Sequence, residues 1–100
     1  MNSGRYTVVF SPIAREEALD AARYIAKDSM QNALKWYDGL EKLIGSLSQF
    51  PRRFGAAREA DAFDIELRQV VYRSHRIIFT IEEQTVTVLH VRHGAQSSLR

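Results

Sequence analysis

The stretch "LRQVVYRSHRIIF", residues 67–79, decides how the second half of this 100-residue chain folds. Val, Ile, Tyr and Phe dominate it, and the polar run "YRSH" divides it into two apolar segments. Such residues favour β-strands, and a short polar run between two strands favours a hairpin. Three arginines and a histidine lie among these apolar residues. Arginines in a sheet are either solvated or line a surface that binds phosphate or an acidic protein.

Alternation of apolar and charged residues starts just upstream and predicts that the first of these strands begins near residue 63. Side chains in a strand point alternately to opposite faces. The set expected to face the core is Phe63, Ile65 and Leu67. The set expected on the other face is Asp64, Glu66 and Arg68.

The two segments that follow continue the sheet. In "RIIFTIE", residues 76–82, the apolar alternation places Ile77 and Phe79 inward and Arg76 outward. A short turn then leads to "TVTVLHVRH", residues 85–93, which has apolar residues at both parities. This pattern predicts either a central strand buried on both faces or a strand with a bulge, so the direction of His90 stays open.

The first half predicts one strand and two helices. "RYTVVF", residues 5–10, is rich in β-branched and aromatic residues, and Ser11 with Pro12 is a typical helix start. This first helix is expected to end near Lys27. "DSMQ", residues 28–31, has capping-box spacing, and an apolar stripe from there to Phe50 predicts a second helix. The few residues between the helices predict an antiparallel helical hairpin.

The predicted fold class is α+β, in the order β-α-α-β-β-β, as a single domain over residues 1–100. The helical hairpin packs on one face of a small, mainly antiparallel four-stranded sheet, and the other face stays partly open. Glu66, Arg68 and Arg76 are expected to converge on that open face, with His90 beside them in one of its two orientations. The open face is therefore a candidate binding surface.

Composition narrows the function classes. The net charge of +2 is mild, so a positive surface has to come from clustering of the arginines. Cysteine is absent, which excludes disulfides and thiolate chemistry, and the three histidines lack the spacing of a zinc hydrolase. We therefore expect no metal and no cofactor. The sequence contains neither a secretion signal nor a membrane-length apolar run, and we expect a cytoplasmic protein without a membrane partner.

Several motifs resemble the RelE/ParE superfamily of type II toxins, and the resemblance runs from about Tyr6 to Gln96. They are "YTVVFSPIAREEALDAARYIAKD" (6–28), "LRQ" (67–69), "HRIIF" (75–79) and "HVRHGA" (90–95). The family fold implied by this resemblance is the one already predicted from periodicity. The resemblance also implies a plasmid-stabilization module in which a cognate antitoxin covers the toxin's helices and sheet and holds it inactive.

The superfamily has two kinds of target, and the resemblance leaves both open. ParE-like members poison DNA gyrase, and "LRQ" with "HVRHGA" fits them better, although Gln96 replaces their usual final arginine. RelE-like members cut messenger RNA in the ribosome, but Asp64 and Glu66 occupy the positions of two of their lysines. Carboxylates there repel RNA phosphate. A degenerate toxin that only binds its antitoxin is a third possibility.

Each reading assigns roles to the same few residues. A nuclease resembling RelE or YoeB would use Arg76 and Arg68 on phosphate, with Glu66 and His90 or His93 for acid–base chemistry. A gyrase poison would use Arg68, Arg76 and His93 to contact its target. Structural alternatives remain: Arg68 paired with an acidic neighbour, His90 packed in its strand, and His93 in a cap or turn. The antitoxin is expected on the exposed flanks of both helices and on the open face, with acidic residues against the arginines.

Overall fold

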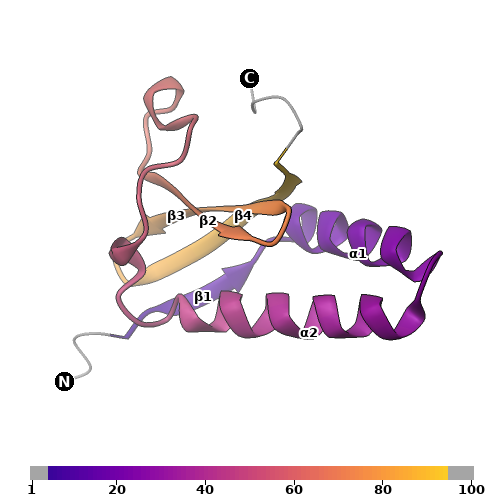
Figure 1. The fold of residues 1–100 in the computed structure, drawn as a ribbon. Helices are drawn as coiled ribbons and strands as arrows, with labels where there is room; N and C mark the ends of the chain where they lie inside the picture. Colours follow the sequence, from indigo (N-terminus) through magenta and orange to yellow (C-terminus); the bar gives the residue numbers. More distant parts are fainter. Residues whose placement is uncertain (1–4, 95–100) are drawn as a thin grey trace.

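The computed structural model describes residues 5–94 and has the predicted α+β architecture (Figure 1). The sheet order is β1-β4-β3-β2; β1 runs parallel to β4, and the other neighbouring pairs are antiparallel. Both helices lie on one side of this sheet. The elements are β1 (Thr7–Phe10), α1 (Pro12–Ala26), α2 (Met30–Ser46), β2 (Leu67–Tyr72), β3 (His75–Glu82) and β4 (Thr85–His93), with 3-10 turns at Pro51–Arg53 and Ala60–Ala62.

Local chemistry explains where the helices begin. The Ser11 hydroxyl accepts a hydrogen bond from the Ala14 backbone N–H at 3.1 Å, and Pro12 occupies the first helical position, as predicted. The second helix is capped by Ser29, not by Asp28: the Ser29 hydroxyl accepts from the Asn32 N–H at 3.1 Å. A serine side chain in extended backbone geometry is a good cap because it satisfies one of the free N–H groups of the first turn.

The second helix ends four residues earlier than its apolar stripe predicts, at Ser46 and not at Phe50. Beyond it the chain pairs with the segment before β1: the Tyr6 N–H donates to the Ser48 carbonyl at 2.8 Å, and Arg5 bridges Gln49. This pairing offers the backbone hydrogen bonds that a continued helix would have used internally. The prediction of a helix as far as Phe50 was therefore wrong.

The main core lies between the helices and the sheet. Ala14 and Ala18 of α1 are fully buried, and their small side chains let α1 approach β4 closely. The α2 side and the sheet contribute larger side chains. The buried members of this core are Ala14, Ala18, Trp36, Leu40, Ile44, Leu47, Ile77, Phe79, Ile81, Val86, Val88 and Val91.

The last strand is both central and bulged, so both patterns weighed for residues 85–93 are present. It lies between β1 and β3. The register with β3 shifts by one residue: Ile78 is paired with His90, but the next residue, Phe79, is paired with Val88. Leu89 is the extra residue. Apolar side chains then occur at both parities because the parity itself changes at the bulge.

The face of the sheet away from the helices, called the far face below, carries a second small core. Ala57, Leu67 and Ile78 are buried there, with Ala60 and Leu89 packed against them. Residues 55–65, called the covering segment, rise over the sheet on the side opposite α1 and α2 (Figure 1). The face is therefore only partly open, as expected, but Arg76, which was expected on the open part, is 4% exposed against Glu59 of the covering segment.

Leu67 lies on the far face, and the expected direction of the 63–68 alternation is wrong. Leu67 is paired with Thr80, one position from Phe79, which points into the main core. Residues 63–66 precede β2 and are not strand, and Phe63 and Ile65 are 40% and 52% exposed. Residues 63–66, which supplied most of this alternation, thus lie outside the sheet.

No helix within residues 5–94 has both the length and the apolar character needed to cross a bilayer.

Candidate functional site

Arg68 and Arg76 lie on opposite faces of the sheet. Antiparallel partners share a face, and Arg68 is paired with Phe79, which points toward the helices. Arg76 directly precedes Ile77, another residue of the main core, so its side chain points to the far face. The expectation that Arg68 and Arg76 converge on one surface is therefore wrong. The cause is the register of β2, in which Leu67 and not Arg68 points to the far face.

Arg76 is held in a buried ion pair that the sequence did not predict. Its guanidinium makes a bidentate contact with the Glu59 carboxylate, at 3.1 and 2.7 Å, and the side chains are only 4% and 0% exposed. The Gln69 side-chain oxygen accepts a further hydrogen bond from Arg76 at 2.7 Å. Glu59 belongs to the covering segment, so this pair fastens that segment to the sheet.

The pair also offsets a repulsion between strands. Arg92 on β4 is the cross-strand partner of Arg76, and like charges directly opposite one another destabilise a sheet. Arg92 itself lies 4.0 Å from the Glu17 carboxylate. The far face thus carries adjacent arginines whose charge is compensated by the chain's own carboxylates.

Arg68 belongs to a separate, half-exposed network at the edge of the sheet. Its Nε donates to Glu66 at 2.7 Å, and Arg52 donates to both Glu66 oxygens at 3.1 and 3.0 Å. The Arg52 guanidinium, and then that of Arg68, lowers the pKa of the Glu66 carboxyl. A carboxylate whose pKa is lowered is a weaker base. Glu66 is therefore poorly suited to the general-base role that a nuclease would require.

His90 lies at a position of β4 that points to the far face, and its ring contacts Glu17 of α1. Its Nδ1 lies 3.2 Å from both Glu17 oxygens, and the same carboxylate accepts the Val91 N–H at 2.9 Å. The last residue of β1 pairs with Val88, so Glu17 continues the hydrogen bonding of β4 beyond the end of β1. His90 also lines a shallow hollow of about 210 Å³ with Phe63, Ile65, Leu67 and Leu89.

His93 lies on the helix side of the sheet, opposite to Arg76. It is paired with His75, and the two rings are 5.3 Å apart in an edge-on arrangement. His75 in turn meets Trp36 edge-on at 5.2 Å. Burial, and then the neighbouring His93, lower the pKa of His75.

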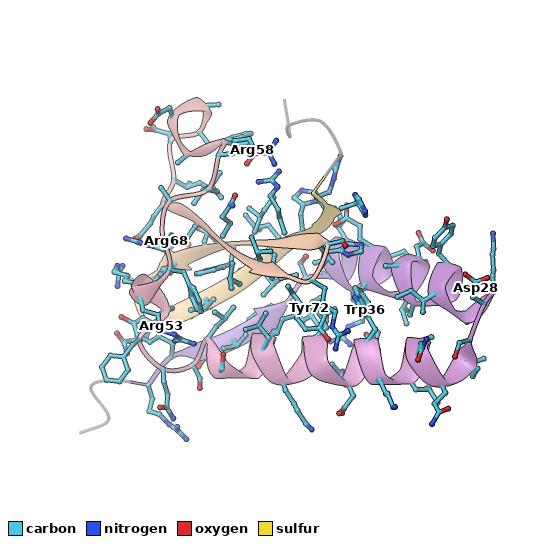
Figure 2. The ribbon with its side chains drawn as sticks, viewed as in Figure 1. Asp28, Trp36, Arg53, Arg58, Arg68 and Tyr72 are labelled. Carbon is cyan, nitrogen blue, oxygen red and sulfur yellow. The ribbon has the colours of Figure 1, made fainter. Side chains whose placement is uncertain are left out.

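Trp36 and Tyr72 complete this aromatic cluster between the β2–β3 hairpin and α2 (Figure 2). The Tyr72 hydroxyl donates to the Trp36 carbonyl at 2.8 Å. Beside them opens a cavity of about 420 Å³, called the hairpin pocket below. It is lined by Ala21, Tyr24, Ile25, Trp36, Arg73, Ser74, His75 and His93.

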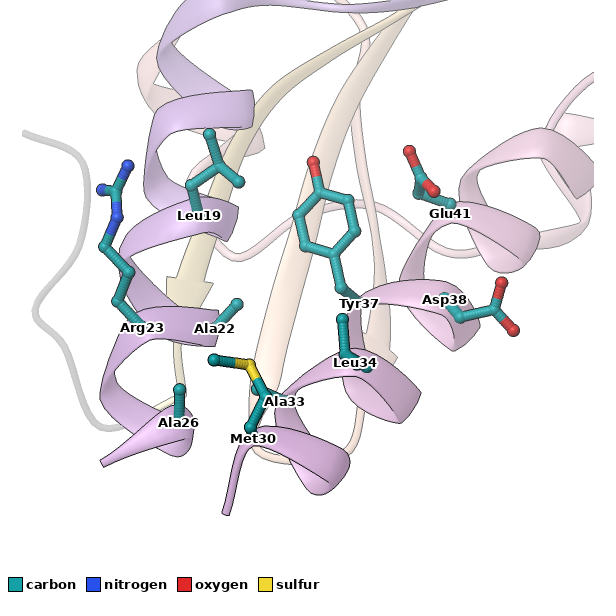
Figure 3. Close-up of a pocket in the computed structure, with 10 residues that line it drawn as sticks. All are labelled: Leu19, Ala22, Arg23, Ala26, Met30, Ala33, Leu34, Tyr37, Asp38 and Glu41. Atoms are coloured by element: carbon teal, nitrogen blue, oxygen red, sulfur yellow. The ribbon is translucent and has the colours of Figure 1, made fainter. Parts of the chain in front are cut away.

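A second hollow, the outer groove, runs between α1 and α2 on their outer side (Figure 3). Its volume is about 450 Å³. Met30 and Leu34 are 63% and 65% exposed there, and Tyr37 stands between the helices. Its charged residues are Arg23 on α1 and Asp38 and Glu41 on α2. The remaining lining residues are Leu19, Ala22, Ala26 and Ala33.

The predicted site residues do not form one cluster. Arg76 and His90 point to the far face, Arg68 and His93 point to the helix side, and Glu66 precedes β2. The sequence does not point to Glu59, because nothing in an irregular segment indicates which acid reaches Arg76. The pairing of Tyr72 with α2 was not predicted either, although Gly39 is a usable signal for it: a Cβ there would clash with the Tyr72 hydroxyl oxygen. Within residues 5–94, no group of three or more His, Asp or Glu side chains is placed to hold a metal ion.

Solved structures share this fold. The chromosomal ParDE toxin–antitoxin system from P. aeruginosa contains a chain with a TM-score of 0.72 and 14% identity, covering 89% of this chain and 96% of that one. The RelBE2 toxin–antitoxin complex from Mycobacterium tuberculosis gives 0.59 and 22%, with 94% and 97% covered. The YoeB dimer from Staphylococcus aureus gives 0.50 and 14%, with 89% and 97% covered.

A family comparison adds sequence evidence to this likeness of fold. No curated protein matches the chain. Residues 8–98 match the family described as the ParE toxin of the type II toxin–antitoxin system, parDE. This match covers nearly the whole chain and agrees with the motifs noted in the sequence. The chain therefore belongs to the ParE toxin family of type II toxin–antitoxin systems.

Proposed function

We propose that this toxin inhibits DNA gyrase by binding it, and that a cognate antitoxin neutralises it in the cytoplasm. The observation that carries the choice of target is the state of Arg76. Its guanidinium is buried against Glu59 on the far face, away from Arg68 and His93 on the helix side. A nuclease needs its cations and its acid–base groups within reach of one phosphate. A binding poison does not need such a cluster.

The charge around β2 supports the same choice. Glu66 remains ionised because Arg52 and Arg68 lower its pKa, and Asp64 lies two residues before it. An RNA backbone approaching this edge meets carboxylates as well as arginines. Arg68 and His93 are the residues we propose to contact gyrase from the helix side. We propose that Arg76, which was predicted to contact the target, acts on gyrase only indirectly, by holding the covering segment in place.

Supercoiling by purified gyrase tests this proposal. Relaxed plasmid, gyrase and ATP are incubated with increasing amounts of the toxin, and topoisomers are separated on agarose. We expect inhibition that is reversed when the antitoxin is added before the toxin. Unchanged supercoiling at a large excess of folded toxin would contradict the proposal. Harmless expression in cells without antitoxin would instead favour a degenerate toxin.

One observation keeps a ribosome-dependent endoribonuclease as the second candidate. Arg76 and His90 point to the same face from neighbouring strands, which is the arrangement that a phosphate-binding cation and an acid–base group would need. The covering segment would have to move to admit RNA. Primer extension on messages translated in the presence of the toxin would then show cuts within codons. Intact messages would exclude this candidate.

We propose the outer groove as the main antitoxin site. It is apolar along its floor, and it follows two neighbouring helices, which is the geometry that receives an amphipathic helix. Arg23 on one rim and Asp38 with Glu41 on the other can pair with charges on such a helix. An antitoxin segment that folds on binding would bury these exposed apolar side chains. This site agrees with the flanks of the two helices expected from the sequence.

A further inference from the structure

The hairpin pocket has the form of a binding site, and of its lining residues only His93 has a role in the proposals for gyrase and the antitoxin. Its volume of about 420 Å³ lies within the range of ligand sites and is large enough for one bulky side chain. Trp36 forms an inner aromatic wall and is only 5% exposed, whereas Tyr24 at the mouth is 72% exposed. Ala21 and Ile25 of α1 add further apolar surface. An apolar group entering this pocket would lose most of its contact with water.

The polar groups around this pocket are cationic or neutral. Arg73 lines it, and the Lys27 ammonium lies 5.6 Å from the centre of the Tyr24 ring. No carboxylate is among its lining residues in the described part of the chain. The outer groove differs, because Asp38 and Glu41 stand on its rim. The hairpin pocket therefore favours an anionic neighbour for whatever apolar group it holds.

One polar atom at this pocket lacks a partner. Nδ1 of His75 is buried and makes no hydrogen bond within residues 5–94. Leaving a buried polar atom unpaired costs about 1–3 kcal/mol.

We propose that the hairpin pocket binds a bulky apolar side chain that is flanked by acidic residues in a peptide segment of the antitoxin. This inference rests on the proposed function, because it assumes an antitoxin partner, and it adds a second docking point with its own chemistry. A nucleic-acid strand is a poorer fit. Binding a strand requires a row of phosphate contacts, and the lining of this pocket offers one guanidinium, that of Arg73.

The intrinsic fluorescence of the toxin reports directly on this pocket, because Trp36 is the chain's single tryptophan. The probe is the peptide acetyl-Asp-Glu-Leu-Glu-Asp-amide, titrated into the full-length toxin. Two control peptides carry Asn and Gln in place of the acids, or Ala in place of Leu. We expect a saturable change in Trp36 emission with the acidic leucine peptide, and binding at least about fivefold weaker with either control peptide, about 1 kcal/mol.

Variants of the toxin locate the binding. Arg73→Gln is expected to weaken the acidic peptide about fivefold or more, and Ala21→Leu, which narrows the pocket, to weaken it further. The Arg73 guanidinium lies over the Tyr72 ring, 5.6 Å from its centre. The matched control is Arg15→Gln, since Arg15 lies over the Phe10 ring at 4.5 Å but does not line this pocket. Folding of each variant is checked by circular dichroism.

Three results would overturn the inference: no saturable change in emission, equal binding of the neutral peptide, or tighter binding of a uridine hexanucleotide than of the acidic peptide. The titration does not depend on toxicity. If the toxin binds the peptide but does not inhibit gyrase, only the proposed target is contradicted. If the toxin inhibits gyrase and is neutralised by its antitoxin but does not bind the peptide, only the role of the hairpin pocket is contradicted.

Discussion

At the scale of single residues, Arg68 and Arg76 differ in how deeply they are buried, although they lie in neighbouring strands of the sheet. Arg76 is 4% exposed and bound to a carboxylate that is fully buried, whereas Arg68 and its partner Glu66 are 25% and 32% exposed. Burying a charge is costly unless it is paired, while a surface pair contributes little. The same residue type is thus fully enclosed at Arg76, whereas Arg68 keeps part of its side chain exposed while it bonds to Glu66 and to the Phe54 carbonyl.

Glu59→Gln should destabilise the toxin strongly, because it leaves the Arg76 charge buried without a compensating charge. We expect a loss of about 3–5 kcal/mol in the free energy of unfolding, measured by urea denaturation. The matched control is Glu66→Gln, which breaks a half-exposed network and should cost at most about 1 kcal/mol. Equal losses for the two variants would show that burial gives the Glu59–Arg76 pair no greater weight than the exposed network.

The two glycines of α2 give a second residue-scale prediction, with opposite signs. Alanine is favoured over glycine in a helix by about 1 kcal/mol, and a Cβ on Gly45 meets nothing within 4 Å, so Gly45→Ala should stabilise the protein. Gly39→Ala should destabilise it, because the new Cβ would displace the Tyr72 hydroxyl from the Trp36 carbonyl. Thermal unfolding followed by circular dichroism measures both.

A double variant checks the cause of the Gly39 effect. Tyr72→Phe removes the hydroxyl oxygen with which a Cβ at position 39 would clash, and the next ring atom is 3.3 Å from that Cβ position. Gly39→Ala combined with Tyr72→Phe should therefore be more stable than Gly39→Ala alone. If the second substitution only adds to the loss, the contact with Tyr72 is not the reason that glycine occupies this position.

His75 should make stability depend on pH below about 7. Burial and His93 lower its pKa in the folded protein, whereas in the unfolded chain it titrates near 6.5. Below that value the unfolded state takes up a proton that the folded state does not, so the free energy of unfolding falls as pH falls. The fall stops once the folded imidazole is also protonated. Urea denaturation of the wild type and of His75→Gln at several pH values measures this. The free energy of unfolding should change less with pH in the variant.

At the scale of elements, the sequence predicts what depends on local periodicity and misses what depends on pairing between distant segments. The Ser11–Pro12 start of α1 and the strand at 85–93 are as predicted. The end of α2 is not as predicted, because backbone pairing at Ser48 competes with the local helical pattern. The start of β2 is not either, because pairing with β3 begins only at Leu67. Since β2 begins at Leu67 on the far face, Arg68 is turned to the helix side. An error of register in one strand thus separates residues that the alternation pattern placed together.

The helical hairpin carries the prediction for antitoxin binding. Leu34→Asp introduces a charge on the floor of the outer groove, where the side chain is already 65% exposed, so folding should be little affected. We expect antitoxin affinity to fall at least about tenfold, measured by isothermal titration calorimetry, while toxicity persists. Lys35→Asp is the matched control, because Lys35 is an exposed neighbour on α2 outside the groove. Equal losses in both variants would point to net charge and not to the groove.

At the scale of the whole molecule, the sheet is covered on one face by the helices and on part of the other by the covering segment. Both hollows that suit a partner, the outer groove and the hairpin pocket, involve the helical hairpin. The far face instead uses its most buried charges to hold the chain's own segment in place. This division favours a toxin that acts through its helical side and keeps the far face structural.

Replacing the buried pair as a whole distinguishes the two targets. Glu59→Met with Arg76→Met removes both charges together, and apolar replacement of a buried ion pair is often nearly neutral for stability. If Arg76 only fastens the covering segment, the double variant should fold, arrest growth and inhibit gyrase as the wild type does. If Arg76 binds phosphate in a nuclease, the folded double variant should be harmless, because no cation then faces the RNA at that position. Three measurements on the wild type and the double variant therefore decide whether Arg76 acts on a target or on the fold. They are growth after induction without antitoxin, inhibition of supercoiling, and the urea midpoint of unfolding.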